Sequence, residues 1–126
     1  DPPSQEEFDV GLLKKLMDEY MSLRHCFYGD YYPLARYSLE EDAWMAWQFD
    51  RPDLGEGIVQ AFRRSESDIV TSQYALLGLD PAATYELRNL DVPDATRMQG
   101  AALMDTGLAV TIPDRRSAVV IRYAEV

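Results

Sequence analysis

The stretch WMAWQFDRPDLGEGIVQAFRR, residues 44–64, decides the fold, because it predicts a long β-hairpin. In its first half the odd-numbered residues Met45, Trp47 and Phe49 carry most of the large apolar side chains, and a period of two places them on one face of a sheet. We expect this face to point into the core. The second half, residues 58–64, has large apolar residues on both faces, so its orientation stays open.

Residues 50–57 between the two halves predict the turn of this hairpin. Pro52 pre-sets its own φ, and the aspartates on either side can hydrogen-bond nearby backbone groups. Gly55 and Gly57 both permit a positive φ. The hairpin prediction therefore rests on turn chemistry as well as on apolar alternation.

Further strands are predicted over residues 71–79, 85–88, 108–112 and 119–123, with a brief strand at 101–104. The prolines at 81 and 113 suit turns, so we expect 71–79 and 85–88 to form a second hairpin. Strands that follow one another without intervening helices favour an antiparallel arrangement. The predicted fold is mainly β, a Greek-key-like antiparallel β-sandwich over residues 29–126.

One long helix is predicted before the sandwich, from about Ser4 to Cys26. Ser4 and Glu7 have the spacing of a capping box, and Gly29 is expected to end the helix in the left-handed conformation. Its apolar stripe is wide enough to pack between two surfaces. If one surface is missing, we expect this stripe to drive self-association as a two-fold dimer. The stripe consists of Phe8, Leu12, Leu13, Leu16, Met17, Tyr20, Leu23 and Phe27.

The composition limits the possible partners. A length of 126 residues suits one domain and is about half of what a barrel enzyme needs. The formal net charge of −10 argues against nucleic acid or an anionic membrane as partner. The single cysteine, Cys26, gives no internal disulfide and favours a cytoplasmic location. The arginine pairs at 63–64 and 115–116 are interpreted as solvated strand ends.

Candidate catalytic residues are few, and we assign none of them. Asp30, Asp50, Asp53 and Glu56 have apolar or glycine-rich neighbours, but turn-capping or solvated roles are favoured for all four. A glycosidase needs two carboxyl groups at a defined separation on a rigid frame. No catalytic residue is predicted, and substrate-binding residues stay unassigned.

His25 and Cys26 are adjacent, which invites a nucleophile-and-base interpretation or a metal site. Adjacent helical residues point about 100° apart, and no third residue is identifiable that would orient the histidine. Two ligands alone cannot form a zinc site, and the sequence contains no CxxC or HExxH spacing. Gly55-Glu56-Gly57 lacks the further glycine of a phosphate-binding loop. We expect no metal and no cofactor.

An aromatic concentration could stack on sugar rings, but a place in the core or in a domain interface is favoured, and we expect Trp47 to be buried. It comprises Tyr31, Tyr32, Tyr37, Trp44 and Trp47.

The hairpin, together with YGDYYPL at 28–34 and LMDTGLAV at 103–110, resembles the end of bacterial α-galactosidases of glycoside hydrolase family 36. The resemblance covers nearly the whole chain. It implies that residues 1–28 are the last helix of a catalytic (β/α)8 barrel and that residues 29–126 are the C-terminal β-sandwich. It also implies that the parent hydrolyses terminal α-galactosides with retention, and that its barrel is the partner of this chain.

That family carries its nucleophile and acid/base aspartates on barrel strands, in motifs such as KWD and a later R-x-D. Neither motif is identified as a catalytic motif in this chain, so the resemblance implies a non-catalytic accessory domain. A free-standing β-sandwich that binds carbohydrate or protein is the alternative. The chain begins at Asp1 without Met, which is expected of a piece of a longer protein or of a processed form.

Overall fold

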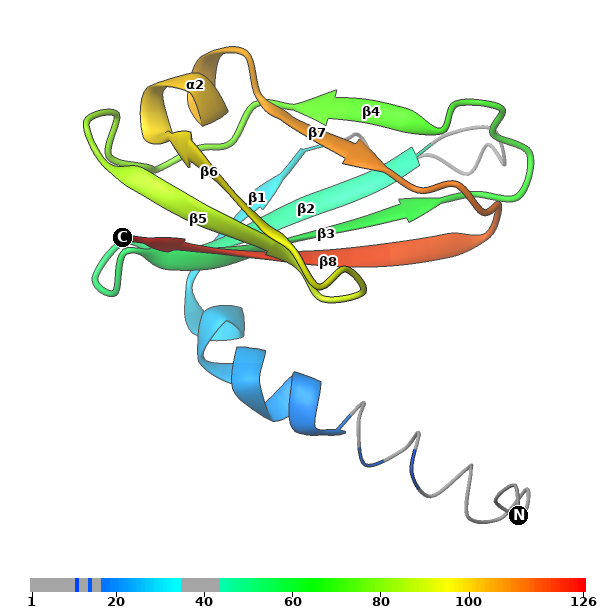
Figure 1. Cartoon of the computed structure of the whole chain (residues 1–126), viewed down its shortest axis with the longest axis horizontal. Coiled ribbons are helices and arrows are strands. Elements are labelled where there is room, and N and C mark those ends of the chain that lie inside the picture. The colour runs from blue at the N-terminus through cyan, green and yellow to red at the C-terminus, as the bar shows by residue number, and fades with distance from the viewer. Residues whose placement is uncertain (1–10, 12–13, 15–16, 35–43) are drawn as a thin grey trace.

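The computed structural model describes residues 11, 14, 17–34 and 44–126 (Figure 1). A helical segment covers residues 17–23 and continues as the 3₁₀ helix η1 (Arg24–Tyr28), and a short helix, α2 (Gly100–Asp105), lies between the sixth and seventh strands. The strands are β1 (Asp30–Pro33), β2 (Trp44–Arg51), β3 (Glu56–Arg63), β4 (Thr71–Tyr74), β5 (Thr84–Asn89), β6 (Ala95–Gln99), β7 (Leu108–Thr111) and β8 (Ser117–Glu125).

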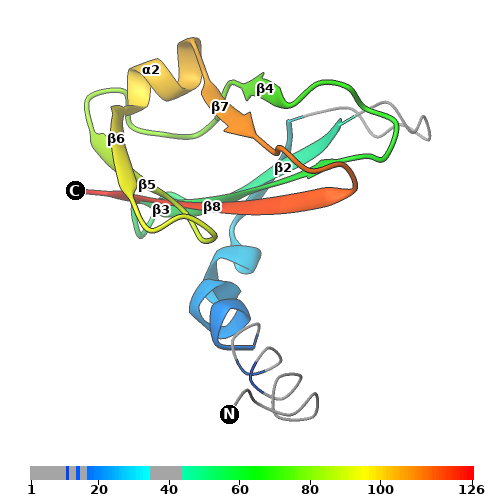
Figure 2. The same cartoon turned by 45° about the vertical axis from the view of Figure 1, so that its right-hand side comes forward.

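The strands form two antiparallel sheets. A six-stranded sheet has the order β1-β2-β3-β8-β5-β6, and β4 pairs with β7 in a two-stranded sheet above it (Figure 1). We name the face of the larger sheet that is turned toward β4 and β7 the inner face, and the opposite one the outer face. The N-terminal helical segment projects from the outer face (Figure 2). The predicted antiparallel β-sandwich with one preceding helix is thus confirmed.

The hairpin of residues 44–64 is confirmed, with Trp44 paired with Arg63 at one end and Arg51 with Glu56 at the other. Gly55 has the positive φ, +66°, that the turn needs. Gly57 does not use a positive φ. It lies at a close approach instead, because a Cβ there would collide with the hydroxyl of Tyr123.

The predicted inward face of the first hairpin strand is wrong. The buried residues of β2 are the even-numbered ones, including Gln48 and Asp50, while the odd-numbered set is only partly buried on the outer face. Burial of these polar residues is possible because both are hydrogen-bonded to the hydroxyl of Tyr123.

The main core lies between the two sheets. Val59 and Ala61 of β3 point into it, which settles the orientation that the sequence left open. The predicted alternation of the last strands is confirmed, since their inward residues are all buried: Tyr85, Leu87, Leu108, Val110, Ile112, Val119, Ile121 and Tyr123.

A smaller apolar cluster joins the helical segment to the outer face. Leu23 and Cys26 pack on Ile58, with Phe27 and Phe49 beside them. The predicted helix is confirmed over residues 17–23, and its Ser4–Glu7 capping box lies outside the described residues. Gly29 is not a left-handed cap, because its φ is −84°. A glycine is needed there because a Cβ would collide with the carbonyl of Asp50.

Three details of the strand prediction are wrong. β4 ends at Tyr74 and pairs with β7, so no second hairpin joins it to β5. The turn at 80–83, which Ala83 N–H closes on the Asp80 carbonyl, leads from one sheet to the other.

Residues 101–104 belong to α2, where Leu103 is fully buried. The edge strands β1 and β6 were not predicted, because β6 is almost wholly exposed and carries no alternation. Among the described residues, no helix is long and apolar enough to cross a membrane.

Candidate functional site

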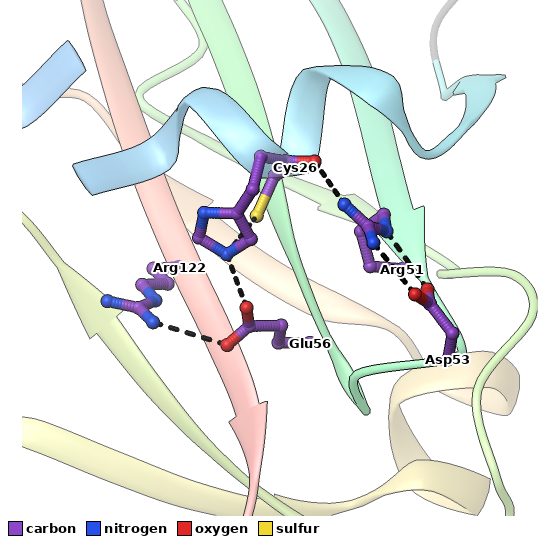
Figure 3. A network of polar contacts seen from close by, with 6 residues as sticks. Cys26, Arg51, Asp53, Glu56 and Arg122 are labelled. Atoms are coloured by element: carbon purple, nitrogen blue, oxygen red, sulfur yellow. Dashed lines mark hydrogen bonds and ion pairs between the residues drawn. The ribbon is translucent and has the colours of Figure 1, made fainter. Parts of the chain in front are cut away.

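Four polar side chains meet where the helical segment lands on the outer face, and we name them the junction cluster: His25, Cys26, Glu56 and Arg122 (Figure 3). His25 and Cys26 come from η1, Glu56 begins β3, and Arg122 lies on β8. His25 Nε2 contacts Glu56 Oε1, and Cys26 Sγ lies 3.5 Å from the same nitrogen. Arg122 Nη2 donates to Glu56 Oε2 at 3.2 Å. The cluster therefore links three segments that are far apart in sequence.

Arg51 and Asp53 brace the junction cluster from the hairpin turn. Arg51 donates to both carboxylate oxygens of Asp53, at 2.9 and 2.7 Å, and to the backbone carbonyl of His25 at 2.7 Å (Figure 3). A guanidinium held on a carboxylate by two bonds is well oriented, so it fixes the turn of η1 that carries His25 and Cys26.

The protonation of this cluster follows from burial and pairing. Burial alone would raise the pKa of Glu56, but the hydrogen bonds from His25 and Arg122 bring it below its ordinary value. Burial, with the Glu56 charge nearby, raises the pKa of the Cys26 thiol. The cluster is thus an ionised carboxylate beside a protonated thiol.

A second polar network lies in the core under β2. Tyr123 donates to Asp50 Oδ1 at 2.6 Å, and Gln48 donates to the tyrosine oxygen at 2.9 Å. Asp50 Oδ2 is buried, and among the residues that the structure describes none is hydrogen-bonded to it. Burial raises the pKa of Asp50 and that of Tyr123. Burying an acid costs free energy, and here its hydrogen bond with Tyr123 fixes the position of the tyrosine side chain in the core.

The outer face carries an apolar hollow of about 230 Å³ beside the helical segment. Trp47 lies in its wall, with its indole N–H bonded to Gln60 Oε1. The outer-face side chains that line the hollow are Met45, Trp47, Gln60, Phe62, Ala118 and Val120. On the helical segment itself, Met17, Tyr20 and Met21 are exposed.

The four candidate carboxylates do not form one site. Asp50 is buried in the core, Asp53 is bound by Arg51, and Glu56 is bound by Arg122. Asp30 is exposed on the edge strand β1. Arg51-Pro52-Asp53 matches the R-x-D pattern in its letters, but it lies at the end of a hairpin strand and in the following turn, and its ends bind each other. These four acids hold the fold together or face solvent.

The arginine pairs are not all surface residues, so that part of the interpretation is wrong. Arg63 is buried and donates to the backbone carbonyls of Ser67, Ile112 and Pro113, tying two loops together. Arg115 is exposed and pairs with Asp68. Arg63 lies at the end of a strand with alternating burial. Carbonyl groups of the neighbouring loops accept its hydrogen bonds in place of water, so the guanidinium can be buried.

The aromatic residues are distributed over both faces of the larger sheet. Trp44 is buried on the inner face and donates to the Ile69 carbonyl at 3.0 Å. Trp47 is only partly buried on the outer face, so its predicted burial is wrong. Tyr31 packs on Phe49 with ring centroids 5.3 Å apart. Tyr37 lies outside the described residues.

Sequence reasoning missed the contact of Glu56 with His25, two residues that are 31 positions apart. Nothing in the local sequence announces it, because only the position of η1 on β3 brings them together. The predicted alternation of the last strand already places Arg122 on the side away from the main core, but it does not show that Glu56 is its partner.

Comparison with known proteins agrees with this architecture. The family model described as the glycosyl hydrolase family 36 C-terminal domain matches residues 44–122. A comparison with curated proteins gives no match.

Solved structures resemble nearly the whole chain. The family 36 α-galactosidase AgaB from Geobacillus stearothermophilus is 28% identical with a TM-score of 0.71, and AgaA from the same organism, solved with 1-deoxygalactonojirimycin, is 25% identical with a TM-score of 0.73. The α-galactosidase from Lactobacillus brevis shares the fold at 19% identity and a TM-score of 0.74. Each match covers 98% of this chain but only 16 to 17% of the relative. The chain therefore belongs to the family of C-terminal domains of glycosyl hydrolase family 36.

Proposed function

We propose that this chain is the non-catalytic C-terminal accessory domain of an enzyme that hydrolyses terminal α-galactosides with retention. The observation that carries the proposal is the family match over residues 44–122, together with structural likeness to the two Geobacillus α-galactosidases over 98% of the chain. Since the chain spans 16% of those enzymes, the catalytic residues belong to another part of the parent. We further propose a cytoplasmic location for the parent, in keeping with the lone Cys26.

The proposed partner is the catalytic barrel of the same parent chain. Residues 1–28 would be the last helix of that barrel, and residues 29–126 the accessory sandwich. Support comes from the outer face, where the described part of the helix joins the sheet beside the apolar hollow. A barrel that carries this helix would lie on the same side and cover both surfaces.

Expression of the 126-residue chain and of its full-length parent tests the function. We expect the parent to hydrolyse an aryl α-galactoside and the chain alone to show no turnover above background. Turnover by the chain that disappears on replacing one of its own Asp or Glu residues would overturn the accessory assignment. Tight galactoside binding by the isolated chain in calorimetry, lost in Trp47→Ala with stability unchanged, would favour a binding module instead.

A further inference from the structure

We propose that the junction cluster is a zinc site, with His25 Nε2, Cys26 Sγ and Glu56 Oε1 as ligands and the fourth position open. The three ligand atoms come from two elements and lie within 4.8 Å of one another. Imidazole, thiolate and carboxylate are the ligand set that zinc takes in proteins. The sequence-based expectation of no metal rested on having only two ligands, and the fold supplies the third.

One of the three ligand separations already matches a tetrahedral ion. With Zn–N of about 2.0 Å and Zn–S of about 2.3 Å, a tetrahedral angle separates the nitrogen and sulfur by about 3.5 Å. The observed separation of His25 Nε2 and Cys26 Sγ is 3.5 Å. The same nitrogen is in direct contact with Glu56 Oε1, closer than the about 3.3 Å expected between two ligands of a tetrahedral ion. The Glu56 carboxylate must therefore turn away from His25 when an ion binds between the three atoms.

The surroundings are built to orient the ligands. Glu56 uses its two oxygens separately, because Oε1 faces His25 and Oε2 accepts from Arg122 at 3.2 Å. A partner on the free oxygen of a ligating carboxylate holds its direction. Arg51 fixes the carbonyl of His25 at 2.7 Å. Both arginines are paired with carboxylates, Arg122 with Glu56 and Arg51 with Asp53, which offsets their repulsion of a cation.

Access to the site is available from one side. His25 is 36% exposed and borders an open depression together with Met21, Arg24, Tyr28 and Arg51. Cys26 is fully buried, so its thiol must lose a proton to the solvent as the zinc–sulfur bond forms.

Cobalt titration of the reduced, metal-free 126-residue chain tests the site. We expect one Co²⁺ per chain, a near-ultraviolet thiolate-to-cobalt charge-transfer band, intensified visible bands of four-coordinate cobalt, and displacement of all of them by Zn²⁺. Cys26 and His25 are the only cysteine and histidine of the chain, so each signal has one possible source. Absence of the charge-transfer band at stoichiometric cobalt overturns the proposal.

Variants distinguish metal binding at the junction cluster from nonspecific metal binding by other acidic residues on the surface. Cys26→Ala should abolish the charge-transfer band, and Glu56→Gln should weaken binding at least tenfold. The matched control Glu66→Gln changes an exposed carboxylate and should leave binding unchanged. Unchanged affinity in Glu56→Gln, or equal losses in Glu56→Gln and Glu66→Gln, overturns the assignment of Glu56. Far-ultraviolet circular dichroism checks that each variant is folded.

A measurement without variants keeps the test independent of folding defects. In nitrogen-15 spectra of the wild-type chain, Zn²⁺ should move the Nε2 resonance of the single histidine and leave Nδ1 protonated. An unchanged His25 spectrum at saturating Zn²⁺ contradicts the proposal.

Discussion

Single residues in this domain show that size and alternation alone do not decide burial. Trp44 and Trp47 are three positions apart on β2, yet one faces the core and the other faces the apolar hollow. The reason lies in Gln48 and Asp50, which share the inner face with Trp44 and are both hydrogen-bonded to the Tyr123 hydroxyl. A polar pair whose common partner is more than 70 residues away cannot be predicted from the local pattern.

Replacing each tryptophan separates the two environments. Trp44→Ala removes a buried indole with a hydrogen bond to Ile69 and should lower the free energy of unfolding by about 3–5 kcal/mol. Trp47→Ala should cost less, since that side chain is only partly buried. Urea unfolding of both variants with matched slopes gives the comparison. A larger loss in Trp47→Ala would contradict the assignment of faces.

Asp50 predicts a pH dependence of stability. Because burial raises its pKa in the folded state, its contribution is most favourable below the ordinary aspartate pKa of about 3.9, and it is lost as the pH rises through the raised value. Asp50→Asn keeps an acceptor for Tyr123 and removes the charge. The stability of the variant relative to wild type should therefore rise with pH above about 4, as measured by denaturant unfolding at several pH values. Parallel profiles for the two proteins would exclude this effect.

At the scale of elements, periodicity served well where one face of a strand is buried. β5, β7 and β8 alternate cleanly, and their inward residues were predicted. β2 and β3 are covered on both faces near η1, so alternation predicted the wrong inward face for β2 and left the inward face of β3 open. Two other elements were not predicted. α2 has only six residues, too few to show a helical pattern, and β6 is a polar edge strand without alternation.

The junction cluster lies beyond such patterns altogether. The sequence places His25 beside Cys26 but favours neither a nucleophile-and-base pair nor a metal site there, because Glu56 joins them only after η1 docks on β3. No local spacing in the sequence shows that residues 25 and 56 lie close together in the fold. The two adjacent residues could therefore be noticed from the sequence, but the candidate site could not be predicted.

The helical segment carries a prediction of its own. Met17 and Met21 are four positions apart, so they lie on the same side of the helix, and both are exposed. We expect the isolated chain to self-associate through this side. Met17→Lys with Met21→Lys should yield monomers in sedimentation velocity with the β-sheet signal intact. The matched control Ile69→Lys changes an exposed apolar residue of a loop and should leave the association unchanged. A wild-type chain that sediments as a monomer would defeat the prediction.

At the scale of the whole molecule, the sandwich has one closed side and one open side. β4, β7 and α2 cover the inner face, whereas the outer face keeps the apolar hollow beside the helical segment (Figure 2). The open side is therefore the one on which we propose that the barrel of the parent rests.

In the full-length parent, a charge in the hollow should disturb the proposed contact with the barrel. Val120→Lys is expected to lower the temperature of thermal inactivation by several degrees, because a buried interface must then desolvate an ammonium group. The matched control Val92→Lys places the same charge on an exposed loop and should have no such effect. The measurement is the temperature at which each variant loses its activity toward an aryl α-galactoside. Equal behaviour of the two variants would argue against the outer face as the contact.

The strand order has a consequence for synthesis and folding. β8 is the last strand in the sequence, yet it lies between β3 and β5 and pairs with both. The ribosome therefore synthesises β1-β2-β3 and β5-β6, the two parts of the larger sheet, before the strand that joins them. Until β8 inserts, the inner edges of both halves have unpaired backbone groups and are open to other chains. For this domain, the interval of greatest exposure to misassembly is the one before β8 inserts between β3 and β5.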